Sequence, residues 1–379
     1  MLDTSLRMIF DDTHSTYRDT VRKVVAGLDI DRHEREGIVE REAWVEAGSA
    51  GLLCPGVPEA YGGPGLDFTF NAIVGEEISY AGAAAGFSLQ SDIVADYLIA
   101  YGSEEQKHKW LPGMVSGEVV SAIAMTEPGA GSDLQGMKTI ARKDGNGWRL
   151  SGSKTYITNG QSADIIIVCA RTTEEGGARG ISLFLVEATD EGFKRGRNLD
   201  KIGLHAQDTS ELAFTDMRVP VANRLGDEGQ GFYQLVGNLP QERLSLAIGA
   251  VAAAEGTFAR TMEYVRERTA FGSPISSFQN TQFVLAELAT ELDIARTFLD
   301  DCIAEHVDGR LTAARAARLK WWATELQVRT ADRCLQLHGG YGYMREYPVS
   351  RAFIDARIQT IYGGTTEIMK TIVAKDLGI

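Results

Sequence analysis

A change in hydrophobic pattern divides this chain into three zones, and this division limits the folds that the chain can adopt. From the start to about Val120 the pattern is helical, and the alanine- and aliphatic-rich stretch 71–99 favours two buried helices over strands. Runs rich in β-branched residues occupy 121–233, and long helical patterns return after them. We therefore predict an α+β protein with an N-terminal α domain (1–120), a middle β domain (121–233) and a C-terminal α domain (234–379).

The middle zone contains the signals of a small, mainly antiparallel sheet. Residues 139–143 and 147–151 flank the sequence Asp-Gly-Asn-Gly, which is typical of a tight hairpin turn. Two β-branched runs, 163–170 and 181–188, are separated by a turn-rich segment. No GxGxxG lies between a strand and a helix, so a Rossmann site is not indicated and any dinucleotide must be held in another way.

The last zone contains stripes of apolar residues at helical spacing. One set recurs every three or four residues and therefore shares one helical face: Val284, Leu288, Leu292, Ala295 and Leu299. The segment 311–337 behaves in the same way. Such stripes indicate core or a subunit interface more often than a cofactor site.

Composition narrows the classes of ligand and compartment. A formal charge of −14 argues against a sequence-independent hold on nucleic acid, although a few arginines can still bind small anions. The four cysteines are far apart and form neither a CxxC pair nor a zinc-like cluster with histidine, so we expect reduced structural thiols and no metal site. The N-terminus is acidic early on, and no stretch approaches the length of a membrane span. We expect a cytoplasmic protein.

Two short runs in the middle zone are candidates for ligand contacts. Residues 124–133 combine glycines and a proline with the hydroxyls of Thr126 and Ser132, so backbone N–H groups can approach a ligand closely. Tyr156 and Thr158 offer a flat ring and a nearby hydroxyl that suit a planar heterocycle. Taken separately, these runs are equally consistent with a surface turn and an ordinary strand end.

Two glycine-rich runs in the last zone are further candidates. Residues 336–343 follow a helical stretch and let the backbone lie against a bulky group such as a ribose or adenine, or they are simply a helix C-cap with a turn. Residues 361–368 place a glycine pair and hydroxyls before the final helix, where free N–H groups can meet a phosphate or an enolate-like oxygen. A plain N-cap is the alternative interpretation there.

Together and in this order, these runs resemble the acyl-CoA dehydrogenase family. The combination of LPQERL (239–244), HGGYGYMREYP (338–348) and IYGGTTEIMK (361–370) is most similar to its long-chain type. AMTEPGAGSDLQG (124–136) is similar to the first family signature, and the run from Gln336 through Arg351 to Asp355 is similar to the second. KIGLHAQDTSELAF (201–214), RTAFG (268–272) and Gln279 also match in order, so the resemblance covers essentially the whole chain.

The resemblance implies a helical N-terminal domain, a central antiparallel β domain and a C-terminal domain like a four-helix bundle, with FAD as cofactor. It also implies an acyl-CoA substrate, a homotetramer that shares its FAD sites between subunits, and an electron-transferring flavoprotein as acceptor. The residues that it assigns to FAD are Met125, Thr126, Gly131, Ser132, Tyr156, Thr158, Arg268, Phe271, Gln279, Gln336, Gly339, Gly340, Thr365 and Glu367. Ser132 is also expected near the thioester.

The catalytic base departs from the commoner family pattern. Many relatives carry the base where this chain has Gly363, whose backbone N–H is implied as a donor to the substrate carbonyl. In long-chain and isovaleryl-type members the base is a glutamate on an earlier helix, which corresponds to Glu242, while Arg243 is implied to contact CoA. Pro240 indicates a helix start, so we expect opposing effects on the pKa of Glu242: the helix N-terminus lowers it and an apolar channel raises it.

Four other functions remain open at this stage. A branched short-chain (isovaleryl-type) dehydrogenase shares the relocated base, and an acyl-CoA oxidase passes its electrons to oxygen. A monooxygenase on the same scaffold does not need the base, and a non-catalytic binding or assembly relative would lack bound flavin. The sequence leaves acyl chain length undetermined, because a pocket separates chain lengths by only about 1–3 kcal/mol per methylene.

Overall fold

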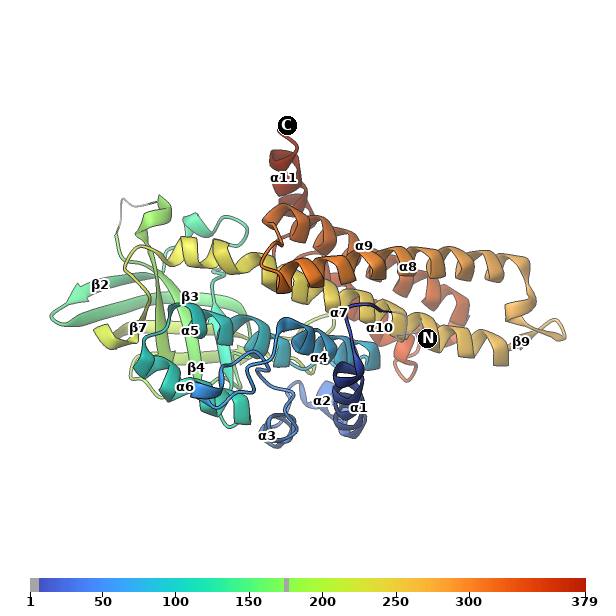
Figure 1. The fold of residues 1–379 in the computed structure, drawn as a ribbon, viewed down its shortest axis with the longest axis horizontal. Helices are drawn as coiled ribbons and strands as arrows, with labels where there is room; N and C mark the ends of the chain where they lie inside the picture. The colour runs from blue at the N-terminus through green and yellow to red at the C-terminus, as the bar shows by residue number, and fades with distance from the viewer. Residues whose placement is uncertain (1–6, 174–176) are drawn as a thin grey trace.

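A computed structural model describes residues 7–173 and 177–379. A twisted sheet forms one end of the molecule, and three long helices extend from it to the other end (Figure 1). Short N-terminal helices lie along one side, and the last helix projects away from the body. The predicted fold class, with helical domains before and after a β domain, is confirmed.

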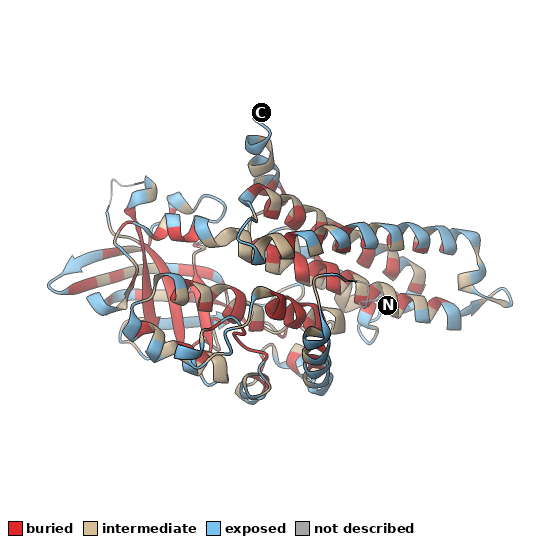
Figure 2. Cartoon of the chain, in the orientation of Figure 1, coloured by how far each residue is buried: buried red, intermediate tan, exposed pale blue. Residues whose placement is uncertain are grey.

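One of the N-terminal helices, α4, is buried on almost every side, because it packs against α1, α7 (Gly231–Glu267) and α8 (Gln279–Val307). The bounds of the N-terminal helices are α1 Asp12–Gly27, α2 Ile30–Glu36, α3 Arg41–Ser49, α4 Phe68–Ala81, α5 Ala95–Tyr101 and α6 Glu104–Ser116. Every residue of α4 from Thr69 to Ile78 is buried, including the polar side chains of Asn71, Glu76 and Glu77 (Figure 2). A π-helical segment, Leu89–Val94, leads directly into α5. The two helices predicted within 71–99 are therefore present as α4 and α5.

The middle domain is one eight-stranded sheet in the order β6-β7-β3-β2-β4-β5-β8, with β1 paired in parallel to β4. The strands are β1 Ser121–Ala124, β2 Ile140–Asp144, β3 Gly147–Thr158, β4 Ile165–Arg171, β5 Ile181–Glu187, β6 Phe193–Asn198, β7 Thr209–Pro220 and β8 Arg224–Leu225. The predicted hairpin is β2–β3, which closes between Asp144 and Gly147. Most pairings are antiparallel, as predicted, and β4 and β5 carry buried side chains along nearly their whole length.

The C-terminal domain consists of three long helices, two shorter ones and a small hairpin. The bounds are α7 Gly231–Glu267, β9 Thr269–Ala270, β10 Ser273–Pro274, α8 Gln279–Val307, α9 Ala313–His338, α10 Pro348–Gln359 and α11 Thr366–Asp376. The apolar stripe predicted on α8 is largely buried, because Leu288, Leu292, Ala295 and Leu299 are all in the core. No helix within the described ranges is both long enough and apolar enough to cross a lipid bilayer.

The predicted helix start at Pro240 is wrong. Helix α7 begins at Gly231 and passes through Pro240 without ending. The turns before the proline are retained because Gln234 and Leu235 are buried, and Leu235 belongs to the core shared with β4 and β5. Tertiary packing thus outweighs the hydrogen bond that proline cannot donate. Glu242 consequently lies about three turns inside α7 instead of in its first turn.

Candidate active site

A buried ion pair between Lys154 and Glu127 holds the glycine-rich loop that follows β1 (residues 124–133). The ammonium of Lys154, on β3, donates to the carbonyl of Met125 and to Oε1 of Glu127, both at 2.9 Å. Glu127 also accepts backbone N–H groups from Lys138 and Thr139. Burial alone would raise the pKa of Glu127, but the Lys154 charge and these hydrogen bonds lower it. The loop therefore has a rigid base, while Gly131 and Ser132 at its tip are exposed to solvent.

Tyr156 leaves the sheet at a β-bulge beside this loop. The pairing of β3 with β7 shifts register between Lys154 and Ile157, and Tyr156 adopts a left-handed backbone with φ of 59°. Its side chain is 70% exposed, although it belongs to a strand of the main sheet. The backbone N–H of Thr155 donates to the carbonyl of Thr126 at 3.0 Å, so the bulge and the loop lie next to each other. The first two predicted cofactor runs therefore form one exposed surface.

A second group of predicted cofactor residues meets at the far end of α7. Arg268, Gln336, Gly339 and Gly340 line one cavity of about 430 Å³. A side chain at either glycine would meet no atom within 4 Å, so the backbone there is open to a ligand. The cavity combines a cation with exposed backbone, which suits the phosphates and sugar of a nucleotide.

Phe271 and Gln279 lie near this end but not in the cavity lining. Phe271 is at the tip of the β9–β10 hairpin and is 99% exposed, and Gln279 is the exposed first residue of α8. The hairpin and the sheet are at opposite ends of the molecule (Figure 1). Within one chain the predicted cofactor residues are therefore divided between two distant surfaces.

The loop between α10 and α11 packs against the middle of α7. Gly363 has φ of 63°, and a Cβ built there would lie 2.2 Å from Cδ1 of Leu246 on α7. Nε of Arg243 donates to the carbonyl oxygen of Gly363 at 3.5 Å. Lys320, which is fully buried on α9, donates to the carbonyl of Gly364 at 2.8 Å. Two cations on different helices thus hold this loop in a conformation that glycine adopts without strain.

Thr365 and Glu367, two further predicted cofactor residues, lie at the N-terminus of α11. Thr365 is the N-cap, and its hydroxyl accepts the N–H of Ile368 at 3.4 Å. Glu367 lies in the first turn and is exposed. Its pKa is lowered by hydrogen bonds to backbone N–H and to the Thr365 hydroxyl.

Glu242 is a buried carboxylate in the same stretch of α7 as Arg243. It is 5% exposed, and its Oε1 accepts a hydrogen bond from the hydroxyl of Tyr97 at 2.9 Å. Burial raises its pKa to about 7, against the opposing effects of the Tyr97 hydrogen bond and the Arg243 charge. The expected conflict with a helix N-terminus does not arise, because Glu242 lies well inside α7 and burial dominates. Arg243, which follows it, is itself 5% exposed and faces the Gly363 loop.

Sequence reasoning missed three residues that shape this site: Tyr97, Lys154 and Lys320. Tyr97 is 145 positions away from its partner in the sequence, so no local motif connects the two. Lys154 and Lys320 are lysines within strand and helix patterns that look solvent-exposed, yet they are 1% and 0% exposed. Burial lowers the pKa of Lys320 to about 8, with a further contribution from the Arg243 charge. The position of Lys320 within the apolar pattern of 311–337 is a signal that could have identified it.

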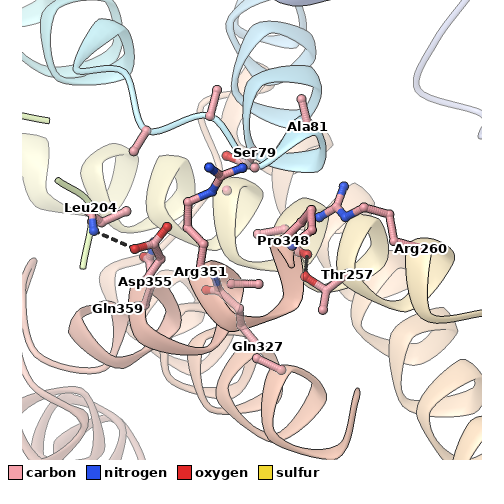
Figure 3. A pocket seen from close by; sticks show the side chains of 17 residues that line it. Ser79, Ala81, Leu204, Thr257, Arg260, Gln327, Pro348, Arg351, Asp355 and Gln359 are labelled. Atoms are coloured by element: carbon pink, nitrogen blue, oxygen red, sulfur yellow. Dashed lines mark hydrogen bonds between the residues drawn. The ribbon is translucent and has the colours of Figure 1, made fainter. Parts of the chain in front are cut away.

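The second signature also has a structural role. Asp355 on α10 accepts the backbone N–H of Leu204 through Oδ1 at 2.6 Å, and Arg351 forms an ion pair with Asp31 on α2 at 2.9 Å. Leu204, Arg351 and Asp355 border a small cavity of about 70 Å³ between α4, α7, α9 and α10 (Figure 3). None of the predicted site residues lines this cavity. Through their bonds to Asp31 and Leu204, Arg351 and Asp355 join the last zone of the chain to the first and the middle zones.

Together, an open glycine loop beside an exposed tyrosine, a nucleotide-sized cavity and a buried carboxylate near pKa 7 fit a flavin-dependent oxidoreductase. The chain belongs to the acyl-CoA dehydrogenase family: its N-terminal, middle and C-terminal domain models match residues 11–118, 122–217 and 229–378. It is thus an FAD-dependent acyl-CoA dehydrogenase of fatty acid oxidation, acting on a CH–CH bond.

Individual relatives are similar over the full chain. The long-chain specific acyl-CoA dehydrogenase of Sus scrofa is 50% identical over 383 residues, which cover 100% of this chain and 89% of that protein. The crystal structure of an acyl-CoA dehydrogenase from Geobacillus kaustophilus is 48% identical, with a TM-score of 0.96 over 98% of this chain and 99% of that one. A chain of a structure described as the electron transferring flavoprotein of Acidaminococcus fermentans is 34% identical, with a TM-score of 0.93 over 97% and 98% of the two chains.

Proposed function

We propose that this protein dehydrogenates long straight-chain fatty acyl-CoA thioesters to trans-2-enoyl-CoA, with Glu242 as the base that removes the α-proton. The observation that carries this proposal is a buried carboxylate with a pKa of about 7 on the face of α7 that packs against the Gly363 loop. A base with such a pKa is about half ionised at pH 7 and still holds the proton once it is transferred.

Gly363 supplies the complementary half of the reaction. An α-C–H beside a thioester becomes acidic only if charge that develops on the carbonyl oxygen is stabilised, and a fixed backbone N–H does this. The Gly363–Gly364 loop is held by Arg243 and Lys320, so its N–H groups need no rearrangement when the substrate arrives. Bound FAD supplies the acceptor for the hydride that leaves the β-carbon. Glycine itself has no carboxylate, and the resemblance to long-chain and isovaleryl-type members implies Glu242 as the base.

The divided cofactor residues support a site shared between subunits. Tyr156 lies on the sheet, against which the start of α7 packs, whereas Arg268 lies at the far end of this 37-residue helix, which is about 55 Å long (Figure 1). The two groups are therefore too far apart for one dinucleotide to contact both within a single chain. The residues around Tyr156 and Thr158 would hold the flavin ring of one subunit, while Arg268, Phe271, Gln279 and the 336–340 run would hold the nucleotide half bound by a neighbour. Both groups fit their part, since one offers an exposed ring and hydroxyls and the other an open cavity with a cation.

This arrangement leads us to propose a homotetramer and, by analogy with the family, an electron-transferring flavoprotein as acceptor. Sedimentation of the flavin-containing protein tests the assembly, and peroxide release during turnover would indicate an oxidase instead. The cytoplasmic location also stays a prediction, which fractionation of cells that express the chain would test.

The long-chain preference rests on the 50% identity with the pig enzyme over the whole chain. Anaerobic titration with acyl-CoAs of graded length and branching, followed by flavin absorbance, tests it. We expect bleaching at the lowest concentration with long straight chains. Preferential bleaching by a branched short-chain thioester would overturn the preference without affecting the assignment of the base.

Glu242→Gln tests the base itself. The variant keeps the side-chain shape, so it should fold, retain yellow FAD and bind acyl-CoA, yet fail to bleach on substrate addition. Glu263→Gln is the matched control, because Glu263 is an exposed glutamate of the same helix. Normal flavin reduction by Glu242→Gln would refute the mechanism.

A further inference from the structure

Tyr97 is a buried phenol whose hydroxyl donates a hydrogen bond to the carboxylate of Glu242. The side chain is 0% exposed, and its hydroxyl donates to Oε1 of Glu242 at 2.9 Å. Among the described residues, no other side chain or backbone group donates a hydrogen bond to this carboxylate. The two oxygens of the proposed base are therefore different: Oε1 is held by the phenol, and Oε2 has no donor within the described part of the chain.

Other charged or titratable groups face Glu242 from three elements. Asp96 lies on α5 one residue before Tyr97, Cys169 lies on β4, and Arg243 is next to Glu242 on α7. Asp96 receives its hydrogen bond from Gln241. Cys169 is a buried thiol whose pKa is raised to about 12 by burial, so it stays neutral. Arg243 directs its Nε to the Gly363 carbonyl. Each of these groups acts on Glu242 through its charge or polarity alone.

We propose that Tyr97 is the positioning residue of the catalytic base: its hydroxyl holds Oε1 of Glu242, so that Oε2 is the oxygen that receives the α-proton. This inference rests on the proposed role of Glu242.

The physical reason is that a buried carboxylate without hydrogen bonds does not keep its charge. Desolvation favours the neutral acid, and each donor to the charged form opposes it. The Tyr97 hydroxyl does not lose its own proton, because burial and the Glu242 charge raise the pKa of Tyr97 far above its usual range. It is therefore a donor at every pH at which the enzyme is folded. It also restricts the carboxylate to one rotation, because moving Oε1 away would leave the phenol unpaired in the core.

Tyr97→Phe removes the hydroxyl and keeps the buried ring. A hydrogen bond to a charged group contributes about 1.5–3 kcal/mol, which corresponds to an upward shift of about one to two units in the pKa of Glu242. We expect the pH midpoint of flavin reduction by bound acyl-CoA, measured anaerobically in stopped flow, to rise by that amount. The rate at pH 7 should fall about five- to fifty-fold and recover to within about twofold at pH 9, while the Kd for acyl-CoA stays unchanged.

Two further variants make the result specific. Tyr101→Phe is the matched control, because Tyr101 lies one turn further along α5 and its hydroxyl donates to Asn238 on α7 at 3.5 Å. The pH profile of this variant should match that of the unmodified protein. Asp96→Asn removes a neighbouring negative charge and should lower the midpoint, opposite in sign to Tyr97→Phe. Infrared difference spectroscopy of the protonated carboxyl band that disappears in Glu242→Gln gives the same pKa without turnover.

The outcomes separate the two proposals. If Glu242→Gln still reduces flavin, the proposed function fails. If Glu242→Gln is inactive but Tyr97→Phe leaves the midpoint and the infrared pKa unchanged, only the role of Tyr97 is overturned. A Tyr97→Phe rate that is low at every pH, with an unshifted midpoint, would also overturn it, because that is the behaviour of a purely structural residue.

Discussion

Replacing Gly363 with alanine tests the packing that places the site. A non-glycine residue at a left-handed φ costs about 1–2 kcal/mol. The new Cβ would also lie 2.2 Å from Cδ1 of Leu246, closer than carbon atoms approach in folded proteins. Overpacking of this kind costs about 1–3 kcal/mol, because Leu246 has to change rotamer or the loop has to move. The sum is a destabilisation of about 2–5 kcal/mol.

Thermal unfolding of the FAD-loaded protein measures this loss. With about 2.1 cal/mol/K per residue, a chain of 379 residues has an unfolding entropy of roughly 0.8 kcal/mol/K, so Gly363→Ala should lower Tm by about 2–6 °C. Gly309→Ala is the matched control: Gly309 has φ of 68° and no atom within 4 Å of a built Cβ. It should show the backbone cost alone, about 1–2 °C.

A double-mutant cycle separates backbone strain from the clash. Leu246→Ala removes the atom that the new Cβ meets, so adding Gly363→Ala to it should cost about 1–3 kcal/mol less than adding it to the unmodified protein. The reasoning is refuted if Gly363→Ala is no more destabilising than Gly309→Ala, or if Leu246→Ala gives no relief.

Three other perturbations have clear expected outcomes. Lys154→Met leaves the buried carboxylate of Glu127 without its cation and should lower the free energy of unfolding by about 3–5 kcal/mol, with loss of FAD. Lys143→Met breaks an exposed ion pair and should lower it by less than about 1 kcal/mol, measured by the same thermal unfolding. Burial raises the pKa of Asp355 to about 7, so the folded protein holds a proton there that the unfolded chain releases near pH 4. The free energy of unfolding therefore falls as the pH rises from about 4 to 7. Asp355→Asn should raise Tm at pH 8 but not at pH 4. The four cysteines are buried with pKa values raised to about 11 or 12, so a thiol reagent at pH 8 should modify none in the folded protein and all after unfolding.

The parts of the fold that sequence predicted are those set by local pattern. The β2–β3 hairpin follows from its turn residues, and the apolar stripe of α8 follows from its spacing. The start of α7 was mispredicted because the proline signal is local, whereas the burial of Leu235 against the sheet is not. The family motifs indicated the Tyr156 surface and the Gly363 loop, but not the contacts that hold them. Lys154 and Lys320 form those contacts from distant strands and helices, and a single sequence does not reveal which lysines are buried.

The pKa of Glu242 could not be predicted from local sequence either. Two opposing influences were predicted from sequence, and the structure removes one of them by placing the residue far from a helix end. The remaining influence, desolvation, depends on how completely α5, α7 and the sheet close around the carboxylate. That closure is a property of the assembled core and has no counterpart in local spacing.

The acids between α5 and α7 determine when the proposed base is available. Burial raises the pKa of Asp92 to about 6 and those of Asp96 and Glu242 to about 7. Gln241 and Ser245, which lie one residue before and three after Glu242, donate to Asp96 and Asp92, so both acids are tied to the same stretch of helix as the base. Buried acids close to one another do not ionise independently, because each negative charge raises the pKa of its neighbours. Their apparent pKa values therefore describe the three acids together and not one residue each. The pH at which flavin reduction begins should therefore respond to substitutions at all three acids. A shift caused by Tyr97→Phe, by contrast, must pass through Glu242, because that carboxylate is the hydroxyl's hydrogen-bond partner.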